Sequence, residues 1–273
     1  MSKPETYPDI IYKYRNWKTE SNKNVLLKNE LFMTSPEYFN DPFDCKIPTN
    51  YNLLDTPKKI EQYAVEFVNR HKVWLLQNDY NLEKEIESIK DDYTNRLEKM
   101  QLNHENDLFV KQNIHYGILS MSSRWNSILM WSHYAEFHKG YCAGFWEDKM
   151  RESGLFGKGG PVTYNPENDY PEINPLKEYK PMIKGFIETN TKANDWSYEN
   201  EYRLFNLYFP EIPTKEDRKI IVPDEFFAEI IIGIMTSEED RKEIIELALK
   251  KGIKVYQAKK VPFKFEITKE EIK

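Results

Sequence analysis

The 273-residue sequence has only two cysteines, Cys45 and Cys142, and it has no long apolar run. Two isolated cysteines supply neither a disulfide framework nor a four-ligand zinc pattern. A membrane helix needs about 20 consecutive apolar residues, whereas the longest run here, at 226–234, contains Glu229 and indicates a buried strand. Residues 1–5 lack an apolar secretion segment. We therefore expect a cytoplasmic protein with no membrane partner.

An excess of basic charge is also missing, since the formal net charge is −6 at pH 7. This balance argues against bulk electrostatic binding of nucleic acid, although it leaves room for a local basic groove. Aromatic residues make up 14% of the chain and hydrophobic residues 40%. Such a composition is typical of a chain that buries a core rather than of a disordered segment.

Strand and helix patterns are mixed without regular alternation. The strand-like segments are rich in β-branched and aromatic residues and occupy 10–15, 31–34, 115–122, 141–146, 201–209, 219–222 and 229–234. Helices are predicted over 127–138 and over 237–251. For the second helix, Ser237 is a favourable N-cap residue and Gly252 is a residue that commonly ends a helix. The absence of a βαβ repeat favours an α+β fold with a mixed sheet over a doubly wound one.

Residues 57–113 differ from the rest because they contain no glycine and only one proline, Pro57. Apolar residues recur every three to four positions over 60–75 and again over 82–100, which is typical of amphipathic helices. We predict two long helices that form a hairpin, inserted into a single α+β domain of residues 1–273 or capping it. The apolar stripe is expected to serve ordinary packing, with partner binding as the alternative.

Polar residues suited to chemistry lie in four blocks. In the first, strand alternation puts Tyr12 and Tyr14 on one face and the neighbouring cations on the other. The planar fork of Arg15 could hold a phosphate, or the cations could simply be solvated. In the second block, Asn40 and Asp41 precede a proline. Their side chains favour a tight loop, which is either plain scaffolding or one wall of a ligand pocket.

The third block surrounds the predicted helix at 127–138 and contains Trp131, His133, Tyr134 and His138. Histidines five residues apart do not share a helix face, which disfavours a zinc site of the His-Glu-x-x-His kind. Each histidine alone is more often an ordinary hydrogen-bonded residue. Neither cysteine stands in an obvious nucleophile arrangement, so we predict neither metal nor thiol chemistry.

The fourth block contains Glu199 and Glu201, whose side chains point to the same side where the chain is extended. Two like charges repel, so they are either left in water at an exposed strand entry or kept together for a reason. A carboxylate pair suits hydroxyl binding and stabilisation of a developing cation. Breaking a glycosidic bond through an oxocarbenium-like state requires both.

In this order the four blocks resemble a large bacterial family known as a domain of unknown function. The matching segments are Tyr-Lys-Tyr-Arg at 12–15, Phe-Asn-Asp-Pro-Phe-Asp at 39–44, Met-Trp-Ser-His-Tyr at 130–134 with His-Lys-Gly at 138–140, and Trp-Ser-Tyr-Glu-Asn-Glu-Tyr-Arg at 196–203. The resemblance extends over most of the chain apart from 57–113.

The chain also resembles one branch of the ADP-ribosyltransferase superfamily, whose split β-sheet holds NAD in a cleft. The resemblance rests on Arg15, Ser120-x-Ser122 and Glu199-x-Glu201 in that order. It implies that Arg15 holds the NAD phosphates and that Ser120 orients the nicotinamide ribose. It further implies that Glu201 is the catalytic carboxylate and that Glu199 positions the acceptor.

The chain departs from that branch in two ways: Ser35 could replace Ser120 as the orienting serine, and the third block has no clear counterpart. A further alternative is that Tyr12 or Tyr14 replaces Arg15 as the anchor on the first strand by stacking on NAD. The other residues expected to contact NAD come from the second and third blocks: Asn40, Asp41, Trp131, His133 and Tyr134.

The leading hypothesis is an NAD-consuming enzyme, either an ADP-ribosyltransferase or an NAD glycohydrolase, with protein, nucleic acid or water as acceptor. By analogy alone it would serve as a toxin or anti-phage effector, with an antitoxin or regulator as partner. One alternative is a nuclease or phosphodiester hydrolase that uses His133 and His138. The other is a non-enzymatic module whose helical hairpin binds a partner.

Overall fold

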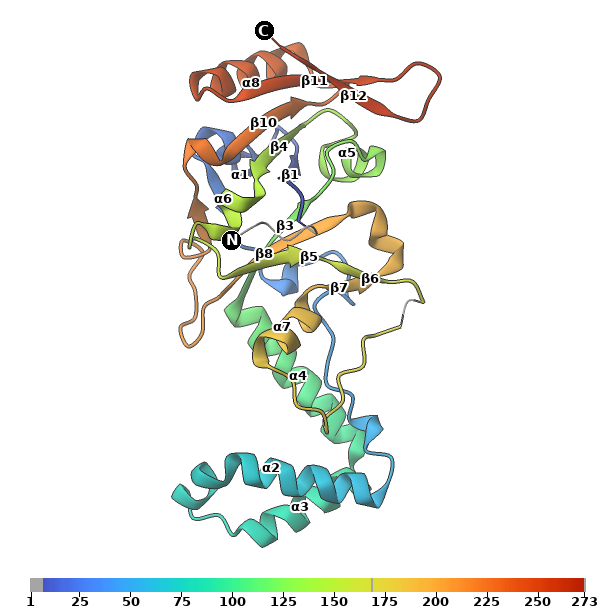
Figure 1. Ribbon diagram of the computed structural model, residues 1–273. Helices are drawn as coiled ribbons and strands as arrows, with labels where there is room; N and C mark the ends of the chain where they lie inside the picture. Colours follow the sequence, from blue (N-terminus) through green and yellow to red (C-terminus); the bar gives the residue numbers. More distant parts are fainter. Residues whose placement is uncertain (1–6, 168, 273) are drawn as a thin grey trace. The chain divides into compact units, whose positions relative to one another are not determined.

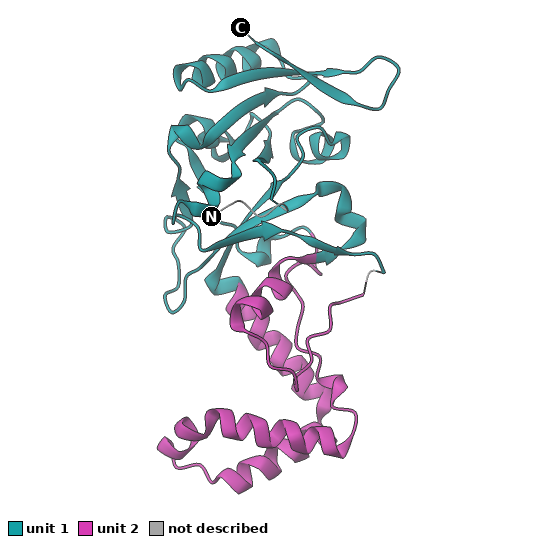
Figure 2. Cartoon of the chain, in the orientation of Figure 1, with its two compact units in different colours: residues 1–40, 113–168, 192–273 teal, residues 41–112, 169–191 magenta. Residues whose placement is uncertain are grey.

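A computed structural model describes residues 7–167 and 169–272. The chain forms two compact units, coloured separately in Figure 2. The first unit comprises 1–40, 113–168 and 192–273, and the second comprises 41–112 and 169–191. Within the described ranges, no helix combines the length and the apolar character that crossing a bilayer requires.

The first unit is built on an eight-stranded sheet with the order β12-β11-β10-β4-β1-β3-β8-β5 (Figure 1). Its strands are β1 (Ile10–Arg15), β3 (Tyr116–Ser122), β4 (Tyr141–Trp146), β5 (Lys158–Pro161), β8 (Glu201–Leu207), β10 (Phe227–Ile232), β11 (Lys254–Lys260) and β12 (Ile267–Glu271). Strands β10 and β11 are parallel and the other neighbours are antiparallel. The prediction of an α+β fold with a mixed sheet is therefore confirmed. Two small sheets pair β2 (Glu30–Phe32) with β9 (Lys219–Ile221), and β6 (Thr163–Asn165) with β7 (Thr191–Ala193).

One face of the large sheet carries the main apolar core. Helices α1 (Glu20–Leu27), α6 (Glu147–Glu152) and α8 (Glu238–Lys250) contribute Leu26, Met150 and Ile244 to this core. Helix α8 starts where the sequence predicts, because the side chain of Ser237 accepts a hydrogen bond from the backbone N–H of Asp240. Since successive strand residues alternate in direction, the opposite face carries a different set of side chains.

The opposite face is covered by α5 (Ile128–Tyr134), whose Trp131 ring meets Tyr14 edge-on with centroids 5.3 Å apart. The predicted helix extended to 138, and this boundary is wrong. Residues 136–138 have positive φ angles of 51°, 55° and 67°, which end the helix. The chain turns back there, so that the N–H of Gly140 bonds the carbonyl of Ala135 at 2.9 Å.

Gly140 lies where β4 approaches the end of β1. A Cβ atom at this position would stand 2.0 Å from the carbonyl oxygen of Arg15. We expect Gly140→Ala to lower the free energy of unfolding by about 1–3 kcal/mol, since the backbone must shift. Urea denaturation measures this loss. Gly185→Ala is the control, because no atom lies within 4 Å of its Cβ position in α7 (Pro181–Thr189); equal stability of both variants would contradict the tight contact.

The sheet opens between β1 and β3. Strand β1 pairs with β4 over all of Ile10–Arg15, but its register with β3 consists of one pair in the described residues, Tyr12 opposite Ser122. The two strands separate beyond that pair. The ammonium group of Lys13 reaches across the opening and donates a hydrogen bond to the carbonyl of Ser120.

The second unit contains α2 (Pro57–Gln77), α3 (Leu82–Asn95), α7 and most of α4 (Leu97–His115). Helices α2 and α3 form the predicted hairpin, but the second predicted helix is in fact two. Arg96 leaves the helical conformation with φ −138° and ψ 26°. Apolar residues before and after this break pack on one cluster, so the hydrophobic spacing continues through it and does not reveal it.

Candidate functional site

The two carboxylates of the fourth block lie at the junction of η3 (Asn194–Glu199) and β8. Asn200 between them adopts the left-handed conformation, with φ 44° and ψ 51°. Glu199 and Glu201 are only 3% and 5% exposed, which excludes the alternative of an exposed acidic strand entry. Because buried charges require partners, their surroundings decide what they can do.

Lys192 on β7 bridges the two carboxylates. Its Nζ lies 2.6 Å from Oε2 of Glu199 and 3.3 Å from Oε2 of Glu201. The same ammonium lies 4.7 Å from the ring centroid of Trp196. Lys192 thereby offsets the repulsion between the neighbouring acids. No motif in the sequence marks Lys192, although it lies only seven residues before Glu199 and nine before Glu201.

Arg203 forms a two-pronged ion pair with Glu201. Its Nε lies 2.7 Å from Oε1 and its second terminal nitrogen 2.9 Å from Oε2. The Arg203 side chain is 1% exposed, and the ring of Phe39 lies 5.4 Å from its guanidinium carbon. Ser120, opposite Arg203 in the β3–β8 register, also hydrogen-bonds to Glu201. This arrangement holds Glu201 in one orientation.

Glu199 is held by two hydroxyl groups. Tyr134 donates to its Oε1 at 2.5 Å, and Ser122 donates to its backbone carbonyl at 2.6 Å. Burial and the bond to Glu199 raise the pKa of Tyr134 well above its usual value. Tyr134 therefore stays protonated and acts as a hydrogen-bond donor. Asn40 forms a further side-chain hydrogen bond with Tyr134.

Lys13 is the third cation near the carboxylates. Burial and the charge of Arg15 lower the pKa of Lys13 well below its usual value, while Glu201 and Glu199 oppose this shift. Strand alternation assigned Lys13, with Arg15, to the face opposite Tyr12 and Tyr14. The opening between β1 and β3 gives the long side chain of Lys13 a path to Ser120.

The charge state of Glu201 follows from its partners. Burial would raise the pKa of Glu201, but Arg203 and then Lys192 outweigh burial and lower the pKa to about 2. A depressed folded-state pKa stabilises the fold above the unfolded value of about 4.3, and this contribution is lost as the pH falls toward 2. We expect the free energy of unfolding to drop between about pH 4.3 and 2. Urea titrations should show a shallower drop in Glu201→Gln, and identical pH slopes would contradict the assignment.

The tyrosines of the first block have other partners. The hydroxyl of Tyr12 donates to Oε1 of Glu229 at 3.1 Å, and Lys269 forms an ion pair with the same carboxylate. The hydroxyl of Tyr14 donates to the carbonyl of Arg124 at 2.7 Å. Both tyrosines are buried in the core beneath α5. They contribute to packing there, and their hydroxyls bond Glu229 and Arg124.

Arg15 lies beside a separate cavity of about 560 Å³ that α1 and β2 also line. Its guanidinium donates to the carbonyl of Tyr14 at 3.2 Å. Ser35, the alternative serine, is buried and donates to the carbonyl of Asn113 at 2.7 Å. Asp41 belongs to the second unit, where its carboxylate accepts from the N–H of Phe43 at 2.9 Å. Ser35 and Asp41 therefore have partners in their own surroundings, and Arg15 lines a cavity of its own.

The third block divides in a similar way. Tyr134 reaches the carboxylates, whereas the indole N–H of Trp131 donates to the carbonyl of Trp125 at 2.8 Å. His133 is exposed, and its ring lies 6.1 Å from that of Tyr198. His138 stacks on Trp131 and lies 3.3 Å from the hydroxyl of Ser132. The two histidines therefore have different neighbours.

The structure thus brings together Ser120, Tyr134, Asn40, Glu199 and Glu201, and it adds Lys13, Lys192 and Arg203. We call these eight residues the carboxylate cluster. Among the described residues, no group of three or more His, Cys, Asp or Glu is arranged to hold a metal ion.

Residues 130–204 match a family model described as "Protein of unknown function (DUF2971)". This span runs from α5 to β8 and includes five members of the carboxylate cluster, namely Tyr134, Lys192, Glu199, Glu201 and Arg203. No curated protein and no solved structure matches the chain.

Proposed function

We propose that the protein is an NAD-consuming enzyme, an ADP-ribosyltransferase or NAD glycohydrolase, with Glu201 as its catalytic carboxylate. The observation that carries the proposal is the setting of Glu201. It is ionised, oriented by Arg203, and hydrogen-bonded by Ser120 at the opening between β1 and β3. The hydrogen bond between Ser120 and Glu201 agrees with the roles that the ADP-ribosyltransferase resemblance implies for these two residues. The same resemblance leads us to expect a sheet that is split at this point.

The chemistry needs a fixed negative charge. As the bond between nicotinamide and C1′ of the ribose breaks, its electron pair leaves with neutral nicotinamide and the ribose becomes cationic. A carboxylate with a pKa of about 2 is fully charged at neutral pH and can stabilise that cation. A hydroxyl or water then attacks C1′ and releases its proton. Glu199, next to Glu201, would orient this acceptor.

A recognition module is the second candidate, and a specific observation favours it. Both carboxylates are buried and already ion-paired with Lys192 or Arg203. Such a network can act as a structural hub that holds β7, η3 and β8 together. In that case the carboxylate cluster would bind no NAD, and a partner would dock elsewhere.

The test is NAD turnover by the purified protein. We expect nicotinamide release, with or without added cellular protein and RNA, and saturable NAD binding by calorimetry. Labelled NAD would then distinguish transfer to a macromolecule from hydrolysis. A toxin or anti-phage role would show as growth arrest on expression. Neither release nor binding under any of these conditions would overturn the proposal in favour of the recognition module.

A further inference from the structure

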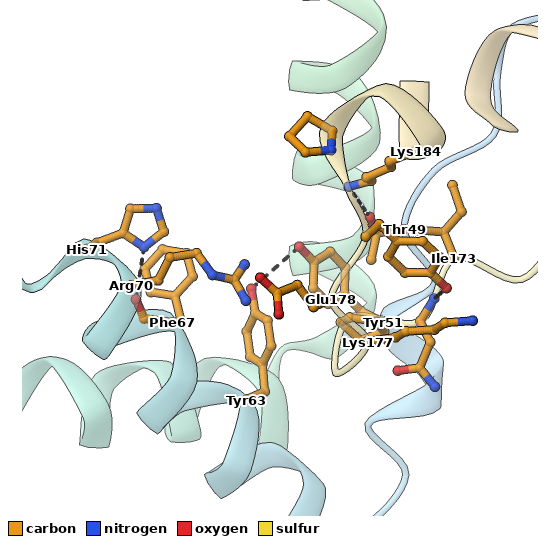
Figure 3. A pocket seen from close by; sticks show the side chains of 14 residues that line it. Thr49, Tyr51, Tyr63, Phe67, Arg70, His71, Ile173, Lys177, Glu178 and Lys184 are labelled. Atoms are coloured by element: carbon orange, nitrogen blue, oxygen red, sulfur yellow. Dashed lines mark hydrogen bonds between the residues drawn. The ribbon is translucent and has the colours of Figure 1, made fainter. Parts of the chain in front are cut away.

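The second unit contains a pocket of about 410 Å³, shown in Figure 3. Its wall is formed by α2, by the segment that leads into α7, and by Thr49 and Tyr51. Pockets of about 300–1,000 Å³ are the usual size for small ligands. Every lining residue belongs to the second unit, so this pocket is independent of the carboxylate cluster.

Cations dominate the charged lining. The charged lining consists of three basic residues, Arg70, Lys177 and Lys184, and one acidic residue, Glu178. The structure describes every residue that lines the pocket. Lys184 donates to the hydroxyl of the buried Thr49 at 3.0 Å and lies 3.8 Å from Glu188. Within the described ranges, Arg70 has no carboxylate at ion-pair distance. In a chain of net charge −6, such a local excess of positive charge favours an anionic ligand.

Aromatic rings provide the rest of the wall. The hydroxyls of Tyr51 and Tyr63 lie 3.4 Å apart, and both residues are buried. Burial raises the pKa of both hydroxyls, which therefore remain neutral donors. The rings of Phe67 and His71, which also line the pocket, are tilted by 35° with centroids 4.3 Å apart. Figure 3 shows Tyr63, Phe67 and Arg70 projecting from the same helix beside the pocket.

We propose that this pocket binds a nucleoside phosphate. The guanidinium of Arg70 and the ammonium of Lys184 would hold the phosphate, because charge-assisted hydrogen bonds to phosphate are strong. The aromatic part of the lining, which includes Tyr63 and Phe67, would contact the base, and the tyrosine hydroxyls can bond its sugar. A bare anion would leave the aromatic wall unused, and an uncharged ring compound would leave the cations unused.

The experiment is calorimetric titration with AMP, CMP, adenosine and inorganic phosphate. We expect a monophosphate to bind, with adenosine and free phosphate at least about tenfold weaker, as hydrogen bonds to charged groups imply. Arg70→Gln should weaken binding by a similar factor. Arg96→Gln is the matched control, because its guanidinium is already paired with Asp91 and Asp92 in the same unit. That control should retain the wild-type affinity.

Three outcomes would overturn the inference. They are no binding of either monophosphate, free phosphate binding as tightly as the nucleotides, and an affinity that Arg70→Gln leaves unchanged. If Arg70→Gln fails to fold, Lys184→Gln takes its place. Titration in the Glu201→Gln background separates this inference from the proposed function. Nucleotide binding that is retained in Glu201→Gln but lost in Arg70→Gln belongs to this pocket. Nicotinamide release by a protein that binds neither monophosphate would overturn this inference and leave the proposed function intact.

Discussion

Replacing Glu201 with glutamine is expected to lower the rate of nicotinamide release by about 100-fold or more, the usual effect of removing a preorganised electrostatic group. Glutamine keeps the shape of the side chain but removes the charge that faces the ribosyl cation. The remaining cations, Arg203 and Lys192, would then oppose cation formation. Release is followed under saturating NAD, so that a change in the rate constant is separated from a change in binding.

A matched control variant separates a loss of catalysis from a loss of folding. Glu147 is also a fully buried carboxylate, and it accepts from Tyr202 at 2.6 Å and from Arg151 at 2.7 Å. Tyr202 belongs to the core on the other face of the sheet. Glu147→Gln should therefore release nicotinamide at nearly the wild-type rate. A wild-type rate in Glu201→Gln, with circular dichroism showing both variants folded, would remove Glu201 from the chemistry.

Replacing Arg203 with methionine is expected to lower the free energy of unfolding by about 3–5 kcal/mol, the range found when one partner of a buried ion pair is removed. Methionine fills much of the same space but leaves Glu201 without its two-pronged partner. The Nζ atom of Lys192 remains 3.3 Å from Oε2 of Glu201, but it also forms an ion pair with Glu199. Urea denaturation at pH 7 measures the loss.

The double variant Arg203→Met with Glu201→Gln provides the comparison. It removes both members of the pair and leaves Lys192 with Glu199, so no lone carboxylate is buried there. We expect the double variant to be more stable than Arg203→Met alone. If Arg203→Met is as stable as the wild type, or if Glu201→Gln brings no recovery, the ion pair does not hold this part of the fold.

Local patterns in the sequence determined much of the first unit. The strand at 10–15 and most strands of the large sheet follow from β-branched and aromatic runs, and the cap at Ser237 follows from its own hydroxyl. Strand β5, with the sequence Lys-Gly-Gly-Pro, contains no such run, and the sequence predicts a loop there. The sequence also indicated that Glu199 and Glu201 need an explanation, because adjacent acids repel. These signals lie within a few residues of one another, so they can be recognised without knowing the fold.

Only the tertiary structure decided which side chains meet the carboxylates. Lys192 lies near the carboxylates in sequence but carries no motif, and Lys13 reaches Ser120 from a distant strand, while Arg15 on that same strand lies at another cavity. The break at Arg96 was hidden because the helices on both sides pack on one cluster. The contact of Lys13 with Ser120 depends on pairing between residues far apart in the chain, and periodicity and local motifs carry no information about that pairing.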